Sequence, residues 1–550
     1  MPSAAVLFPV VLPLAAAAVV GIFGVAGVHL GRVVSAVGAW ACVAALLAVW
    51  VPVRSSVELT LGQLGYGSSF DLRIDAVSVA FGLMVAAPTA FLLTLQPRTW
   101  PEATISLLGL ASAVTALEAG GVVLTAIAGA TAATLAIVLL ETEDPRAPRP
   151  SWATVLAGWL ALTWVGVLLQ VRGGTAVFSA VPVSTVTGPI FALIALAALL
   201  TSCIFPWRAW PSQIWSRPSL RAAGVTVATL FPLGFYLLVR AYELGDGRYP
   251  HPLFHLGLAA LGVLIAFAAA ARAQAATTRR EFLGEVIPFF GGLALAAIAI
   301  GTALGLVAGL VILATAVTLV AGMAILPDAA SIASLVTIAA AVGLPPGIAF
   351  GSRVVAVEAM FEAGDFWGLI GIAGVAAWAA LMVGGARAIG LPAGRGHPSS
   401  ETFPRVALGV ALLTLLAGPG LAAVQLGFAD PVASEVMPGT ASSLGGGLTS
   451  IVTVSSVLPV VTLFIPLLVL AAILYAVVAV STIQTQSRPA LFPAPAAAAA
   501  LRVRAALRSL TVPEQYRSIF SIRELEVAAS GGKPLLWLAA LVALAFAVTR

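Results

Sequence analysis

Long apolar runs with few charges recur along this chain from Val6 to Val548, and they restrict its possible folds more than any other feature. Hydrophobic residues make up 61% of the 550 residues and charged residues only 9%, with a mean hydropathy of +1.08. Globular domains carry about 25% charged residues. Because hydrocarbon cannot satisfy backbone polar groups, such runs are expected to cross a membrane as α-helices. The predicted fold class is an all-α polytopic membrane protein, with no detachable soluble enzyme.

A helix needs about 20 apolar residues to cross the hydrocarbon layer, and this criterion predicts sixteen spans, with a range of about 14 to 16. Residues 1–26 lack a basic leader and are interpreted as the first span rather than a removed signal. Residues 118–121 and 301–305 are interpreted as turns between spans. The predicted spans begin near residues 4, 33, 76, 103, 121, 152, 188, 220, 253, 283, 304, 329, 366, 405, 452 and 534.

The basic residues test this alternation, because Arg and Lys collect in cytoplasmic loops. The chain has 27 of them, all arginine except Lys533. With these spans, 20 fall in one set of loops, 6 in the opposite set, and Arg353 lies inside a span. The asymmetry predicts both termini outside a plasma membrane of bacterial or archaeal type. It also attributes the net charge of +5 to loops, so a nucleic-acid partner is excluded and the lipid bilayer is the expected surrounding.

Residues that could hold a metal or cofactor are scarce. The two cysteines, Cys42 and Cys203, lie in separate apolar runs, which suits neither a disulfide framework nor a zinc or iron–sulfur site. All four histidines fall in predicted loops, so none is a convincing buried proton relay. We therefore expect no cofactor, no metal and no catalytic residue in this chain.

Two proline-rich breaks interrupt predicted spans. Pro206 and Pro211 follow the span that begins at 188, and Pro345 and Pro346 interrupt residues 327–363, which are too many for one straight crossing. Each break falls in the fourth helix of a five-helix run, residues 103–240 and 252–387, and the two runs start on opposite sides. Broken helices at matching positions are typical of inverted repeats that enclose an ion or substrate path.

Arg353 is the charged residue for which a position in the membrane is most costly. Insertion of an arginine at the centre of a membrane helix costs about 2.5 to 3.5 kcal/mol unless the side chain is paired or hydrated. Glu358 and Glu362 share one helix face four residues apart and are its expected partners. The alternative is an arginine that extends to the interface, beside interfacial acids. Glu118 and Glu285 are interpreted as interfacial.

The chain divides into five parts on this interpretation. Within the last part, residues 498–527 alternate apolar and charged positions at helical spacing and are predicted to form an amphipathic helix along the cytoplasmic interface, ahead of a final anchoring span. A solvated linker is the alternative. The five parts are residues 1–102, the two five-helix runs at 103–240 and 252–387, residues 405–481, and residues 498–550.

The order of these features resembles the antiporter-like family, which comprises the large proton-pumping subunits of respiratory complex I, of membrane-bound hydrogenases and of Mrp-type sodium/proton antiporters. The resemblance covers residues 55–390 and the tail, and only the ordered set of motifs is specific. The motifs are FDLRIDAVS at 70–78, FPWRAWP at 205–211, YLLVR at 236–240, TTRR at 277–280 and GLPPGIAFGSR at 343–353.

The resemblance also shows what this chain lacks. The family has a buried Glu in the fifth helix, a Lys in the seventh and a His or Lys further on, and the corresponding positions here are Gly129, Thr201 and Thr226. Only Arg353 is charged at an expected position, and arginine is effectively never deprotonated. The resemblance implies a membrane subunit of a redox-driven translocating assembly whose proton-relay charges are largely missing.

Three interpretations stay open. The chain is a structural or modified subunit of a complex-I-like (NADH-quinone oxidoreductase-like) or hydrogenase-like assembly, which the lost charges favour. Alternatively, it is an active proton or cation antiporter-like subunit, including one of an inorganic-carbon uptake complex, with water between hydroxyls such as those of Thr201, Ser202, Thr226 and Thr229. A stand-alone carrier that uses Arg353 as an anion contact is the third. The first two imply other membrane and hydrophilic subunits as partners.

Overall fold

The computed structural model describes most of the chain up to residue 437 and two short strands beyond it. The described residues are 3–27, 31–50, 56–65, 68–96, 98–143, 152–202, 214–215, 217, 219–247, 249–326, 331–392, 403–437, 450–452 and 457–459. The predicted amphipathic helix at 498–527 and the span from 534 lie outside them, as do Pro206 and Pro211.

Eleven helices in the described residues are long and apolar enough to cross a membrane, so the chain is an integral membrane protein. The chain does turn between consecutive helices near the two predicted places, but the gaps are at residues 119–121 and 300–302 rather than 118–121 and 301–305. The long helices are α1 (Phe8–Val25), α2 (Gly31–Trp50), α3 (Ala76–Leu95), α4 (Trp100–Glu118), α5 (Val122–Glu143), α6 (Trp152–Gly173), α9 (Arg221–Leu244), α10 (Pro252–Ala275), α11 (Arg279–Ala299), α12 (Ala303–Ala324) and α15 (Asp365–Ile389).

Shorter elements fill the places where predicted spans are interrupted. The predicted span from 329 is two helices, and the one from 405 is a series of short helical pieces that includes a π-helix, Gln425–Ala429. These elements are α7 (Gly188–Ser202), α13 (Ile332–Val342), α14 (Ile348–Glu362), α16 (Pro404–Leu416), α17 (Leu421–Val424), α18 (Asp430–Val436) and the 3-10 helices Ser3–Leu7, Val183–Thr185 and Gly418–Gly420.

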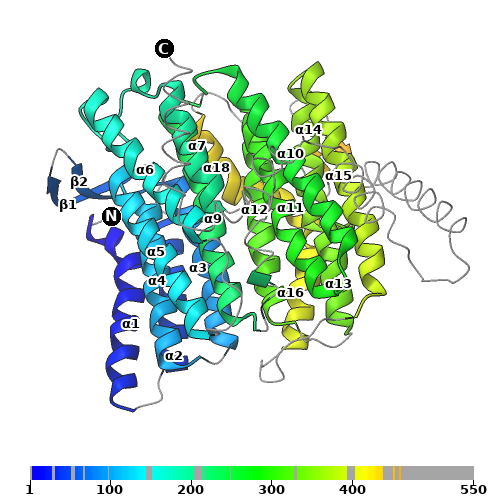
Figure 1. The fold of residues 1–550 in the computed structure, drawn as a ribbon, viewed down its shortest axis with the longest axis horizontal. Coiled ribbons are helices and arrows are strands. Elements are labelled where there is room, and N and C mark those ends of the chain that lie inside the picture. The colour runs from blue at the N-terminus through cyan, green and yellow to red at the C-terminus, as the bar shows by residue number, and fades with distance from the viewer. Residues whose placement is uncertain are drawn as a thin grey trace, which may run out of the picture.

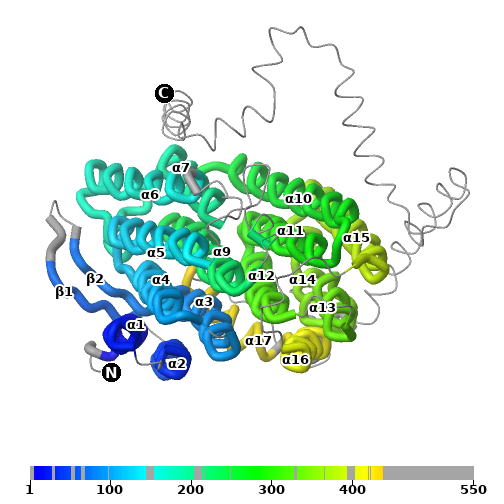
Figure 2. The backbone as a smooth tube through the Cα atoms, turned by 60° about the horizontal axis from the view of Figure 1, so that its bottom comes forward, coloured from blue at the N-terminus to red at the C-terminus, as the bar shows by residue number. Residues whose placement is uncertain are grey.

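Two antiparallel hairpins complete the described fold. β1 (Val57–Gly65) pairs with β2 (Ser68–Ile74) beside α1, as Figure 2 shows. β3 (Ser450–Val452) pairs with β4 (Val457–Pro459). The prediction of a helix from residue 452 is therefore wrong where the structure describes this segment, because β3 and β4 are extended and pair with each other. The other residues of the segment lie outside the described ones.

Helix beginnings follow local sequence signals. Thr278, Thr302 and Ser331 each precede a helix and accept a hydrogen bond from a backbone N–H in its first turn. Asp75 does the same for α3, where the Ser78 hydroxyl also contacts the Asp75 backbone N–H. These side chains satisfy donors that have no partner inside the helix.

The helices form two groups that meet along a central seam. Figure 1 shows α1 to α9 on one side and α10 to α16 on the other, with α18 crossing behind the boundary. α9 packs against α3, α5 and α7 and also against α12 of the second group. The inverted relation between residues 103–240 and 252–387 stays a prediction.

Candidate ion-pathway residues and a buried ionic cluster

The predicted break at Pro345 and Pro346 is confirmed. α13 ends at Val342 and α14 begins at Ile348. Gly343 has the left-handed backbone conformation (φ 77°) and donates to the Ala340 carbonyl, while the next N–H donates to that of Ala339. This is the Schellman arrangement, in which a glycine just past the helix closes its end. The carbonyls of residues 341 and 342 are left for other donors.

Arg353 supplies those donors. Its guanidinium is buried and donates through Nη1 to the Val342 carbonyl and through Nη2 to that of Ala341 at 2.6 Å. Trp378 Nε1 donates to the Val342 carbonyl as well, at 2.7 Å. The negative end of the helix dipole also stabilises a positive charge at a helix C-terminus. Three aromatic rings lie 4.7–5.4 Å from the guanidinium carbon: Phe289, Phe290 and Trp378.

The expected pairing of Arg353 with Glu358 and Glu362 is wrong. Among the described residues, the hydrogen bonds of Arg353 go to carbonyl oxygens and none reaches either acid. Helical side chains lean toward the N-terminus of their own helix, so Arg353 reaches back to α13 while both acids lie toward the end of α14. Glu358 is half-buried and close enough to the exposed Glu362 for mutual repulsion.

Thr201, Ser202 and Thr226 are all buried. The first two end α7, where Ser202 packs against Gly234 of α9 and donates to the Leu199 carbonyl at 3.3 Å. Thr226 lies about 12 Å nearer the beginning of α9, eight residues at about 1.5 Å each. Its hydroxyl has no hydrogen-bond partner within the described part of the chain. The structure thus places the three hydroxyls on the α7 and α9 side of the seam, and their role in an ion path stays a prediction.

Gly129 faces an aromatic ring. The indole of Trp159, from α6, lies directly against it and is 1% exposed. A Cβ atom at position 129 would overlap this ring. A carboxylate-bearing side chain therefore fits at position 129 only after Trp159 moves away.

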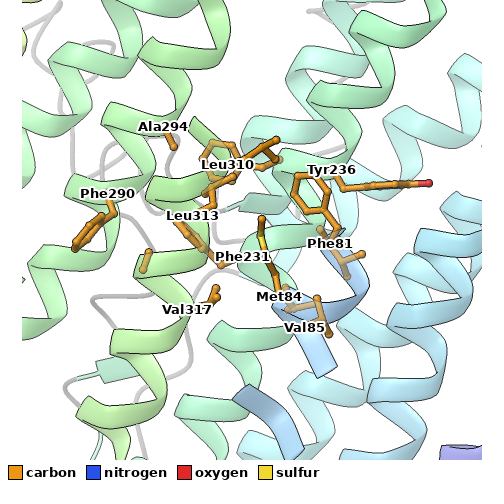
Figure 3. Close-up of a cluster of buried hydrophobic side chains, with 14 of the residues drawn as sticks. Phe81, Met84, Val85, Phe231, Tyr236, Phe290, Ala294, Leu310, Leu313 and Val317 are labelled. Atoms are coloured by element: carbon orange, nitrogen blue, oxygen red, sulfur yellow. The ribbon is translucent and has the colours of Figure 1, made fainter. Parts of the chain in front are cut away.

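Apolar side chains fill the central seam, as Figure 3 shows. They come from α3, α9, α11 and α12, and all are buried. An ionised group here would be transferred out of water without a partner, which costs several kcal/mol. The labelled side chains are Phe81, Met84, Val85, Phe231, Tyr236, Phe290, Ala294, Leu310, Leu313 and Val317.

Arginines also donate to carbonyl groups near the ends of two other helices. Arg279, from the TTRR motif, donates to the carbonyls of Ala388 (3.2 Å) and Ile389 (2.6 Å) at the end of α15 and to the Ser334 hydroxyl of α13 (2.9 Å). Arg217 donates to the Leu140 carbonyl near the end of α5 at 2.8 Å. These buried arginines thus satisfy carbonyl groups near helix ends.

Two further motifs meet in a buried ion pair that the sequence did not predict. Asp75 and Arg240 are 2% and 1% exposed. Arg240 Nη2 donates to Asp75 Oδ1 at 2.8 Å, and Nη1 lies 2.8 Å from Oδ2. Arg240 Nε donates to the Tyr236 hydroxyl at 3.0 Å. The arrangement is a bidentate pair, which is stronger than a single contact.

Arg73 extends the pair into a cluster. Its Nε lies 3.0 Å from Asp75 Oδ2, and its Nη2 lies 2.7 Å from Glu243 and 3.3 Å from Glu435. Glu435, on α18, also accepts from the Ala76 N–H at 2.8 Å. Burial by itself would raise the pKa of Asp75, but the guanidinium groups of Arg240 and Arg73 outweigh it and hold that pKa below its usual value. We call Asp75, Arg73, Arg240, Glu243 and Glu435 the ionic cluster.

Three carboxylates of the ionic cluster, from Asp75, Glu243 and Glu435, lie close enough together to share a metal ion. Two guanidinium groups already hold the same oxygens, which favours an ion-pair network over a cation site. The sequence signals were the 70–78 and 236–240 motifs, noticed only as marks of resemblance. Glu435 gave no periodic signal, because it lies beyond the interrupted helix.

The sequence pattern predicts that Glu118 is interfacial. It does end α4, but protein covers it completely, at 0% exposure. Glu285, interpreted in the same way, pairs with Arg272 at 2.8 Å in a partly exposed position.

No protein-family model matches the chain, and no curated protein matches it. Solved structures do. A chain of the Mrp complex of Dietzia sp. DQ12-45-1b matches with a TM-score of 0.72 and 19% identity, covering 99% of this chain and 63% of that one. This chain thus spans less than two thirds of the length of that relative.

Two other solved structures are covered almost completely. A chain of the membrane-bound sulfane sulfur reductase, an archaeal respiratory membrane complex, matches with a TM-score of 0.69 and 17% identity over 98% of this chain and 99% of that one. A chain of respiratory complex I from Thermus thermophilus gives 0.62 and 19% over 81% and 100%. The fold predicted from the resemblance to the antiporter-like family is confirmed.

Proposed function

We propose that this chain is a membrane-arm subunit of a complex-I-like or hydrogenase-like assembly that moves protons or sodium ions, and that its own part is structural or strongly modified. The shared fold with chains of the Mrp complex, the sulfane sulfur reductase and complex I supports membership of such an assembly. Its partners would be other membrane subunits and hydrophilic redox subunits. The arginine distribution supports a bacterial or archaeal plasma membrane with the N-terminus outside.

The observation that carries the structural role is the packing of Trp159 on Gly129. In the family this position bears a glutamate, and here a large ring takes up the space that such a side chain would need. A reversion at position 129 alone would overpack the helix interface by more than a methylene group, which is itself destabilising. The absence of the family glutamate at position 129 is thus accompanied by a tryptophan ring packed in the space that its side chain would need.

Arg353 supports the same role. Both of its Nη groups already donate to carbonyl groups at the end of α13, so the guanidinium holds a broken helix together. This engagement also weighs against a stand-alone carrier that uses Arg353 to contact an anion. A buried arginine in this position stabilises structure, and it does not act as a proton relay because its guanidinium is not deprotonated in proteins.

Thr226 favours the second candidate, an active antiporter-like subunit. Its buried hydroxyl has no hydrogen-bond partner among the described residues. Buried polar groups of this kind are commonly satisfied by ordered water. Water beside Thr226 could relay protons without ionisable side chains, which is what a path of water between buried hydroxyls requires.

Proton pumping by the intact assembly separates the two candidates. Inverted membrane vesicles are prepared from cells with the wild-type chain and from cells with Thr226→Val, which removes the hydroxyl at nearly constant volume. The structural role predicts an unchanged ratio of protons moved to electrons transferred. Thr315→Val is the matched control, because Thr315 is also buried but lies on α12, and its hydroxyl already donates to the Val311 carbonyl at 2.7 Å.

Co-purification in mild detergent shows that each variant still assembles. A lower ratio for Thr226→Val, with the Thr315→Val assembly at the wild-type ratio, would reject the structural role and support conduction. A chain that purifies without other subunits would reject membership of an assembly.

A further inference from the structure

Glu118 is a carboxyl group enclosed by protein, and no described residue neutralises it with a hydrogen bond or an ion pair. It is the last residue of α4, is 0% exposed, and neither of its oxygens has a hydrogen-bond partner among the described residues. The other buried acids with ion pairs, such as Asp75, are held by arginine. Glu118 therefore differs from them in environment and requires a separate explanation.

The backbone around Glu118 cannot swing outward. Ala119 forms a β-bridge with Leu72 of β2, and the Gly120 N–H donates to the Asp71 carbonyl at 2.7 Å. On the other side, the Tyr236 hydroxyl donates to the Leu117 carbonyl at 2.8 Å. These contacts attach the end of α4 to β2 and to α9, so the carboxyl stays enclosed.

The groups around Glu118 do not favour a negative charge on it. Asp75 and Cys42 are both close enough for electrostatic interaction with Glu118, and Asp75 repels it. All three nitrogens of Arg240 are directed to Asp75, Glu243 or Tyr236. The titratable and charged groups near this end of α4 include Cys42 on α2, Asp71 and Arg73 on β2, Asp75 before α3, and Tyr236, Arg240 and Glu243 on α9.

An isolated carboxylate in such a place costs several kcal/mol, and a neutral carboxylic acid costs far less. We propose that Glu118 is a proton-binding site, which holds a proton as a neutral carboxylic acid beside the ionic cluster. This inference goes beyond the proposed function, because it concerns a group at a position outside the motifs of the resemblance and holds whether or not the chain conducts.

A proton fits this site better than a sodium ion. A bound alkali cation needs several oxygens that converge on one point, and hard cations take six or more. Among the described residues, the only acid cluster with this spacing is Asp75, Glu243 and Glu435, and Glu118 is not part of it. A proton needs only one oxygen of the carboxyl.

Infrared spectroscopy of the purified full-length chain, alone or within its complex, detects the proton directly. The C=O stretching band of a neutral carboxylic acid should be present at neutral pH, should shift in heavy water, and should be absent in Glu118→Gln. Glu118→Asp should keep the band at a shifted frequency, so the assignment does not depend on one variant. Glu362→Gln, at an exposed position, is the control and should keep the wild-type band.

Replacing choline chloride with sodium chloride completes the test. The proposal predicts an unchanged band, because sodium would bind only the ionised carboxylate. Loss of the band in sodium would overturn the proposal in favour of a cation site. No carboxylic acid band in the wild type, or one that persists unchanged in both Glu118 variants, would overturn it as well.

Discussion

Asp75 and Arg240 illustrate what a buried charge requires of its partner. Both are almost fully enclosed, and the desolvation of each ion is offset by two parallel contacts to the other. Such a pair contributes little net stability compared with apolar residues of the same shape. Removal of one partner is different, because the other charge is left buried and alone.

Arg240→Met should therefore lower the free energy of unfolding by about 3 to 5 kcal/mol. Thermal unfolding in detergent measures the loss as a reduced melting temperature. Arg272→Met is the matched control, because its partner Glu285 lies at 2.8 Å but Arg272 is 34% exposed. Such exposed pairs are worth about 0 to 1 kcal/mol. Equal losses in the two variants would contradict the argument.

At the scale of helices, the break between α13 and α14 depends on Gly343. Its left-handed conformation closes α13 and brings the carbonyls of Ala341 and Val342 within reach of Arg353. A Cβ atom at Gly343 would lie 2.5 Å from Arg353 Nη1. The backbone conformation and the arginine contact thus both require glycine.

Gly343→Ala should destabilise the chain by more than about 1 kcal/mol, because alanine is strained at positive φ and meets the guanidinium. Gly409→Ala is the control. Gly409 lies inside α16, and a Cβ atom added there would meet nothing within 4 Å, so alanine should stabilise by up to about 1 kcal/mol. Melting temperatures that change in the same direction would contradict this assignment.

The sequence predicted helices better than contacts. Apolar length and turn residues were sufficient for most span beginnings and for the break at Pro345, because hydrocarbon allows few alternatives to a helix. Spacing on one helix failed for Arg353, whose partners are carbonyls of another helix. The packing of Trp159 on Gly129 could not be predicted either, because it depends on how α5 and α6 meet.

Over the whole molecule, the ionic cluster joins parts that are far apart in the chain. Glu435 lies about 360 residues after Arg73 and Ala76, yet contacts both. α18 also packs against α3, α9 and α12, so it bridges the two helix groups behind the seam in Figure 1. A single carboxylate thus fastens the late part of the described chain to the beginning of α3.

Glu435→Ala should release α18 while leaving the helix groups folded. The N–H of Ala76 and the Arg73 guanidinium each lose an acceptor, a cost of about 1 to 3 kcal/mol for each buried group left unsatisfied. Hydrogen exchange of the α18 amides should then accelerate by about tenfold or more, because local opening sets their exchange rate.

Ser434→Ala is the control on the same helix, since Ser434 is exposed and its hydroxyl donates only to the Pro431 carbonyl. Unchanged exchange in Glu435→Ala would mean that apolar packing of Val432, Ala433 and Val436 holds α18 in place without the ionic cluster.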